Sequence, residues 1–185
     1  MVVVALAAVL ILGVGWWHRA AVRTAEAVSA RWTLDCTDTK VRGGSRTLVV
    51  ESRPGFRCQV DLRVVNASDR SIRVQHVGAP VLGSGGGGEI RGYSTTDATV
   101  HETSDGDDVD AVYEVGLTVP AHAARTVRLA VGWRASGCNS AGHMGFPRWP
   151  TLAFDTMHRS FRYLPDQKLV LRTYDDAHED KACAG

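Results

Sequence analysis

The chain has 185 residues, of which 44% are hydrophobic and 22% charged. This length allows one ordinary domain and a short extra segment, and this composition is typical of a folded protein rather than a disordered one. A formal net charge of +1 gives no overall attraction to nucleic acid, so we expect no nucleic-acid partner.

The first predicted element is an apolar helix. Residues 2–17 contain no charge, and as a helix they would extend about 24 Å, slightly less than the roughly 30 Å hydrocarbon core of a bilayer. Trp16 and Trp17 suit the lipid–water boundary. A cleaved signal peptide is the alternative, but no basic n-region precedes the run and the best small-x-small site, Val28-Ser29-Ala30, lies far beyond it. We therefore predict a transmembrane anchor over residues 1–17.

The charges around this helix do not agree with an exported domain. Arg19 and Arg23 follow the apolar run, and the positive-inside tendency alone would keep the rest of the chain in the cytoplasm. A start codon assigned too late, which would remove a basic leader, is a hypothesis that reconciles the two. The cysteines decide the compartment that we predict.

The four cysteines are Cys36, Cys58, Cys138 and Cys183, and no two form a C-x-x-C pair. Zinc-ribbon and thioredoxin sites therefore lack their spacing. An even number of scattered cysteines behind a hydrophobic leader predicts two disulfides in an oxidising compartment. Of the three possible pairings we favour Cys36–Cys58 with Cys138–Cys183. The sequence thus predicts a single-pass protein of the cell membrane with its C-terminal domain outside the cytoplasm.

Residues 18–35 have helical propensity and are predicted to form a juxtamembrane stalk, and residues 36–185 the extracytoplasmic domain. In this domain the hydrophobic period changes to two, which is typical of strands with one buried face. Seven to nine short strands separated by Gly, Pro, Asn and Asp turns favour an all-β antiparallel sandwich. The clearest runs have as inward residues Cys58, Val60, Leu62 and Val64; Ile72 and Val74; Tyr113, Val115, Leu117 and Val119; and Val127, Leu129, Val131 and Trp133.

The pair CQVDLRVVNASDRSIRV and VGLTVPAHAARTVRLAV resembles the strand–turn–strand pattern of immunoglobulin-like and fibronectin-like domains in membrane-anchored bacterial-type envelope proteins. The resemblance covers most of residues 45–135 and concerns architecture only. It implies an immunoglobulin-like sandwich, but the strand after Cys58 lacks the core Trp of true immunoglobulin domains. Asn66-Ala67-Ser68 is formally a glycosylation sequon, although Asn in a tight turn is more simply explained by turn geometry.

The stretch GCNSAGHMGF suggests a second kind of site. Cys138-x4-His143 resembles the spacing of azurin-type cupredoxins, and this resemblance implies a copper site made by His76, Cys138, His143 and Met144. In azurin-type loops the methionine comes four residues after the histidine, whereas here that position is Pro147. Copper would also need Cys138 as a free thiolate. The disulfide interpretation accounts for all four cysteines and is preferred, with no cofactor expected.

Three loops form the candidate partner surface. The glycine-rich loop, Gly83–Gly92, is followed by an expected edge strand with Glu89 and Arg91 at its start. The acidic loop places Asp105, Asp107, Asp108 and Asp110 within six residues, as a solvated turn or a calcium site. Phe146 and Trp149 form an apolar recognition edge if they are exposed and cap the sandwich if they are buried.

No G-x-S-x-G or H-E-x-x-H motif is present, so we expect no enzyme. The sequence predicts a non-catalytic, membrane-anchored module that binds or scaffolds at the cell envelope. Its expected partners are the membrane and an envelope protein, and its small-molecule ligand is not identified. The alternative is a cupredoxin-like copper protein.

Overall fold

The structure is a computed structural model that describes residues 2–80, 82–83, 90–105, 108–134, 143–146 and 149–173. Within helices and strands, the side chains of residues 2–8, 104–105, 108, 143–144 and 173 lie outside the description. Helix α1 (Val2–Glu26) precedes the strands. The strands are β1 (Val28–Thr37), β2 (Val41–Gly43), β3 (Thr47–Ser52), β4 (Arg57–Asn66), β5 (Ile72–Ala79), β6 (Ile90–Tyr93), β7 (Thr99–Asp105), β8 (Asp108–Val119), β9 (Ala123–Trp133), β10 (His143–Phe146), β11 (Thr151–Thr156), β12 (Arg159–Tyr163) and β13 (Lys168–Thr173).

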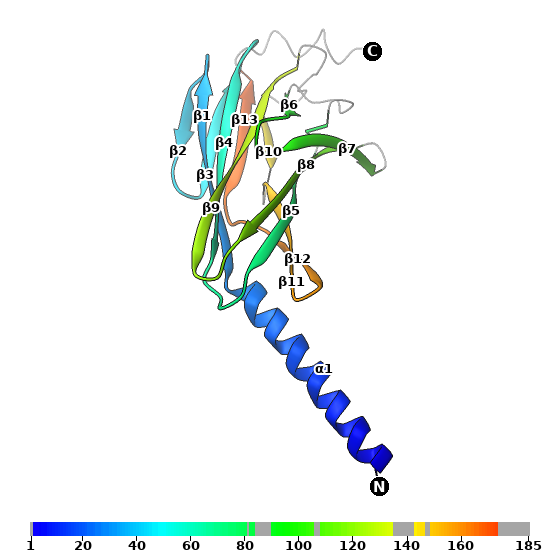
Figure 1. Cartoon of the computed structure of the whole chain (residues 1–185). Helices are drawn as coiled ribbons and strands as arrows, with labels where there is room; N and C mark the ends of the chain where they lie inside the picture. Colours follow the sequence, from blue (N-terminus) through cyan, green and yellow to red (C-terminus); the bar gives the residue numbers. More distant parts are fainter. Residues whose placement is uncertain are drawn as a thin grey trace.

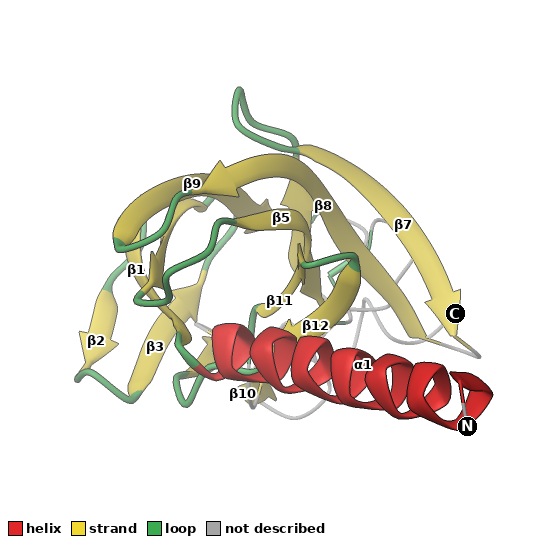
Figure 2. Ribbon diagram, turned by 60° about the horizontal axis from the view of Figure 1, so that its bottom comes forward, coloured by secondary structure: helices red, strands yellow, loops and turns green. Residues whose placement is uncertain are grey.

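The strands form three sheets that curve around one core (Figures 1 and 2). The first sheet has the order β1-β4-β9-β6, the second β10-β13-β3-β2 and the third β12-β11-β5-β8-β7. All pairs are antiparallel except β13 with β3. The first and third sheets meet at the Tyr113 hydroxyl of β8, which donates to the backbone oxygen of Ala130 in β9 at 2.7 Å. Burial of this phenol raises its pKa.

The core confirms the predicted alternation. Cys58, Val60, Leu62 and Val64 are buried along β4, as are Ile72 and Val74 along β5 and Val127, Leu129 and Val131 along β9. On β8, Tyr113 and Val119 are buried, whereas Val115 and Leu117 are half-buried, as is Trp133 on β9. The all-β prediction is therefore confirmed, with the described part containing more strands than the seven to nine expected.

Strand β1 joins this core through its tryptophan. Trp32 is 1% exposed and lies edge-to-face on Trp149, with ring centroids 5.1 Å apart. Aromatic pairs in this geometry stabilise a core beyond the area that they bury. Trp149 lies two residues before the start of β11, so the contact packs a strand of the first sheet against the segment that enters the third.

The segment predicted as a helical stalk over residues 18–35 differs from that expectation. The helix ends at Glu26, and after the single residue Ala27 strand β1 begins at Val28. Burial alternates along β1, with Val28, Ala30 and Trp32 inside, so the segment gains more from core burial than from helical propensity.

The last turns of α1 pack on the sandwich, while the rest projects away from it (Figure 1). Ala21 is completely buried, and Thr24 is 5% exposed. Arg159 at the start of β12 donates to Nδ1 of His18 and lies 5.7 Å from the ring centre of Trp17. The described side chains of α1 begin at Val9. Within the described part of the chain, no helix is long and apolar enough to cross a membrane.

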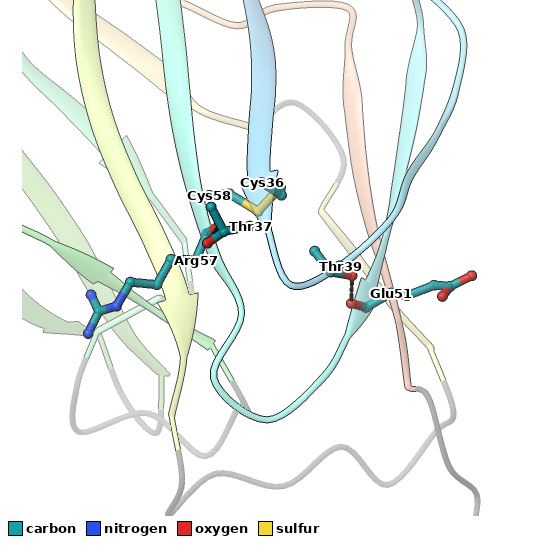
Figure 3. The surroundings of a disulfide bond; sticks show 6 residues. All are labelled: Cys36, Thr37, Thr39, Glu51, Arg57 and Cys58. Carbon is teal, nitrogen blue, oxygen red and sulfur yellow. Dashed lines mark hydrogen bonds between the residues drawn. A yellow bond between two sulfur atoms is a disulfide. The ribbon is translucent and has the colours of Figure 1, made fainter.

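The predicted Cys36–Cys58 disulfide is confirmed (Figure 3). The two residues are directly opposite in the β1–β4 register. Beside it, the Thr39 hydroxyl donates to the backbone oxygen of Glu51, which ties the β1–β2 connection to β3 (Figure 3). The second predicted disulfide, Cys138–Cys183, lies outside the described residues.

Replacing Trp32 should remove the contact between the sheets. We expect Trp32→Ala to lower the free energy of unfolding by about 3–5 kcal/mol, as for other buried aromatic residues. Guanidinium unfolding followed by circular dichroism measures this. Trp16→Ala, at a side chain with 64% of its surface exposed, is the matched control and should change stability by less than about 0.5 kcal/mol. A cost below about 1 kcal/mol for Trp32→Ala would contradict the role assigned to the pair.

The disulfide should stabilise the sandwich by restricting the unfolded chain. Cys36 and Cys58 are 22 residues apart, and a loop of this size corresponds to about 3 kcal/mol. We expect a Cys36→Ala/Cys58→Ala variant to lose about that much in urea unfolding. Alkylation of the unreduced native protein, read by peptide mass, should leave both cysteines unmodified. Modification of either would show that the bond is absent.

Candidate ligand pocket beside strand β1

Strand β1 is an edge strand of the first sheet, since only β4 pairs with it. Its other edge is bonded by a side chain. The amide nitrogen of Gln167 donates to the backbone oxygen of Trp32 at 3.0 Å, and the amide oxygen accepts from the backbone nitrogen of Trp32 at 2.9 Å. One glutamine therefore occupies the position of a neighbouring strand and satisfies an edge that would otherwise be open.

A pocket of about 390 Å³ lies beside these two hydrogen bonds, with Gln167 in its lining. Its size falls within the usual range for small-molecule sites. The polar residues around it come from three elements that are far apart in the chain: Ser29 and Arg31 of β1, Ser45 and Arg46 of the β2–β3 turn, and Tyr163, Asp166 and Gln167 at and after the end of β12.

The charges of this pocket are available to a ligand. Arg31, Arg46 and Asp166 are exposed, and the ion pairs found among the described residues involve none of them. Two guanidinium groups present planar sets of donors that suit carboxylate or phosphate oxygens. Asp166 and the hydroxyls of Ser29, Ser45 and Tyr163 can bond to the hydroxyl groups of a ligand. The arrangement is equipped for binding a polar, anionic small molecule.

Nothing in the pocket points to a metal. Its lining includes one carboxylate and no histidine or cysteine. Among the side chains that are described, no three His, Cys, Asp or Glu residues gather closely enough to hold a metal ion.

The residues of the alternative copper site lie on different sheets where they are described. His76 is half-buried at an irregularity of β5, opposite Glu114 of β8. His143 and Met144 are successive residues of β10, in the second sheet. Cys138 lies outside the described residues, so the copper site stays a prediction.

Two of the three predicted surface loops leave the same end of the sandwich. The backbone nitrogen of Gly83 donates to the oxygen of Val109 at 2.8 Å, which brings the start of the glycine-rich loop against the acidic hairpin. A Cβ at Gly83 would lie only 2.4 Å from the Val109 side chain, so this approach requires glycine. In the hairpin, Asp105 pairs in register with Asp108, and Asp110 with Thr103. Glu89 and Asp107 lie outside the described residues.

Arg91 lies on β6, at the edge of the first sheet as expected. Its guanidinium is 4.5 Å from the ring centre of Tyr93, and Arg57 of β4 lies 4.3 Å from the same ring. Two cations on one aromatic ring stabilise the sheet edge. Arg91 therefore interacts within the fold, and its part in a partner surface stays a prediction.

The apolar recognition edge at Phe146 and Trp149 is not formed. Phe146 is 3% exposed and Trp149 is completely buried. Both side chains belong to the core, so the alternative in which they cap the sandwich is confirmed, and they contribute no docking surface.

No protein-family profile matches the chain, and no curated protein matches it. The solved structures similar to this chain include three at 10% identity each. A GH20 exo-β-N-acetylglucosaminidase from Vibrio harveyi, in complex with N-acetylglucosamine, matches 78% of this chain with a TM-score of 0.34. The major pilin subunit of Bacillus cereus matches 77% with a TM-score of 0.35. A non-cellulosomal cohesin from the archaeon Archaeoglobus fulgidus matches 75% with a TM-score of 0.28.

The matched regions are 18% of the glucosaminidase, 40% of the pilin and 93% of the cohesin. This chain therefore spans only a part of the first two proteins.

The two hydrogen bonds from Gln167 to Trp32 should stabilise the edge of β1 beside the pocket. We expect Gln167→Ala to lower the free energy of unfolding by about 1–3 kcal/mol, because the two Trp32 backbone groups lose their partner. Thermal or urea unfolding measures it. Gln59→Ala, whose side chain donates to Asp61 at the exposed face of β4, is the matched control and should be nearly neutral. Equal effects of the two substitutions would contradict the role assigned to Gln167.

Proposed function

We propose that this protein is a non-catalytic binding module, tethered to the outer face of a membrane by α1, that captures a polar anionic ligand in the pocket beside β1. The observation that carries the proposal is the exposed apolar surface of α1. The pocket and the disulfide provide the rest of the support.

The described start of α1 is apolar on every side. Exposed fractions lie between 62% and 73% for Val9, Leu10, Ile11, Leu12, Val14 and Trp16. Four consecutive residues, 9–12, cover more than a full turn, so no polar face is left for water. A helix that is hydrophobic all round is buried in a protein core or in lipid, and this one projects away from its own sandwich (Figure 1).

The cysteine chemistry supports the proposed compartment. A disulfide between two strands persists in an oxidising space and is rare in the cytosol, where thiols are kept reduced. The Cys36–Cys58 bond therefore supports a domain outside the cytoplasm. The pocket lies on that domain, with Ser29 and Arg31 only a few residues beyond the end of the helix.

Vesicle flotation of the full chain tests the tether. We expect the protein to float with neutral phosphatidylcholine vesicles, and a Leu10→Asp/Leu12→Asp variant to stay in the soluble fraction, because charges are costly in hydrocarbon. Leu164→Asp is the matched control: this leucine is also exposed, at 44%, but it lies on the sandwich, and the variant should float like the native protein. Equal flotation of the Leu10/Leu12 variant would overturn the tether.

A further inference from the structure

A second cavity lies where the helix meets the sandwich. It has a volume of about 370 Å³, between the last three turns of α1 and the turn that joins β4 to β5. Trp16 stands at its outer end, and Arg23 of the helix and Arg70 of the turn contribute the two cations of its lining. The cavity begins where the exposed apolar part of the helix ends.

The two arginines have no carboxylate partner among the described residues, since neither belongs to an ion pair there. Asp69 also lines the cavity, but its carboxylate accepts from Nε2 of His122 at 2.8 Å and is 94% exposed. Two guanidinium groups at one cavity without a bound carboxylate leave an excess of positive charge and several unused donors.

The turn that carries Arg70 is fixed by a buried amide. Asn66 is completely buried, and its amide nitrogen donates to the backbone oxygen of Arg70 at 2.8 Å and to that of Pro120 at 3.0 Å. Its oxygen accepts from the hydroxyl of Ser68 at 2.7 Å. This explains Asn66 by turn geometry and leaves no exposed amide for a glycan. It also fixes the backbone from which the Arg70 side chain extends.

The distance of the cavity from the lipid–water boundary suits a lipid headgroup. Indole side chains prefer the lipid–water boundary, and Arg23 follows Trp16 by seven residues, which is about 10 Å along a helix. The polar layer of each leaflet is about 5–8 Å thick. With Trp16 at the boundary, the long side chains of Arg23 and Arg70 come within reach of the phosphate layer.

We propose that this junction cavity binds the phosphate of an anionic phospholipid between Arg23 and Arg70. The inference rests on the membrane tether of the proposed function and adds a lipid preference to it. The tether is apolar and indifferent to headgroup charge, whereas the junction cavity discriminates anionic from zwitterionic lipid.

The test uses the full chain in neutral detergent micelles. Its thermal unfolding is followed while phosphatidylglycerol, phosphatidylcholine or inorganic phosphate is titrated in. A ligand that binds only the folded state raises the melting temperature in proportion to its affinity. We expect phosphatidylglycerol to raise it and the other two to leave it unchanged. Arg23→Gln and Arg70→Gln should each weaken the apparent affinity for phosphatidylglycerol about tenfold, since each removes a charged hydrogen-bonding group.

Arg128→Gln, at an exposed arginine in the middle of β9, is the matched control and should keep the native affinity. The melting temperatures without lipid should agree among all variants, which shows that they fold. Unchanged phosphatidylglycerol affinity in both cavity variants would overturn the proposal, as would an equal response to inorganic phosphate. Flotation with neutral vesicles depends on the tether alone, so a failure of the tether and a failure of the cavity are separately visible.

Discussion

The fold depends on strand β1, whose two edges form hydrogen bonds with different partners. Ten residues of β1 pair with β4 along one edge, and the Cys36–Cys58 bond closes the end of that ladder. On the other edge, Gln167 bonds to both backbone groups of Trp32. The indole of Trp32 packs edge-to-face on the indole of Trp149. Trp32 thus takes part in the β1–β4 ladder, two side-chain hydrogen bonds and an aromatic contact, and together with the Tyr113–Ala130 bond it links the first sheet to the rest of the core.

The same arrangement places both candidate sites. The gap bridged by Gln167 leaves the polar pocket, because a full neighbouring strand would have filled that space with backbone. At the start of β1, the turn fixed by Asn66 packs beside the helix and leaves the junction cavity. Both sites therefore lie beside strand β1, and each presents two arginines that form no ion pair with a described carboxylate.

The parts of the fold that follow from local pattern could be predicted. Alternation in β4, β5 and β9 identified most of the buried residues, and the predicted disulfide partners Cys36 and Cys58 are opposite one another. Strand β1 was missed because the alanines of residues 18–35 favour a helix, although Val28, Ala30 and Trp32 already alternate with polar residues. That alternation was the signal available for it.

Contacts between distant segments could not be predicted from a single sequence. Gln167 and Trp32 are 135 residues apart, and no local pattern links them. The parallel pairing of β13 with β3 is equally non-local. The pocket residues Arg31, Arg46 and Asp166 look like ordinary surface charges in the sequence, and only the topology gathers them. Phe146 and Trp149 were ambiguous because an aromatic loop residue reads the same whether it is exposed or buried.

Only Ala27 separates the helix from the first strand, and even this residue is bonded on both sides. Its nitrogen donates to Arg23 and its oxygen accepts from Ala67 at 3.0 Å. A linker of one bonded residue has no slack, so the sandwich cannot swing like a domain on a flexible leash. A helix held in lipid would fix the tilt of the whole domain. If α1 lies in lipid as proposed, the faces of the sandwich would keep one orientation relative to the membrane surface.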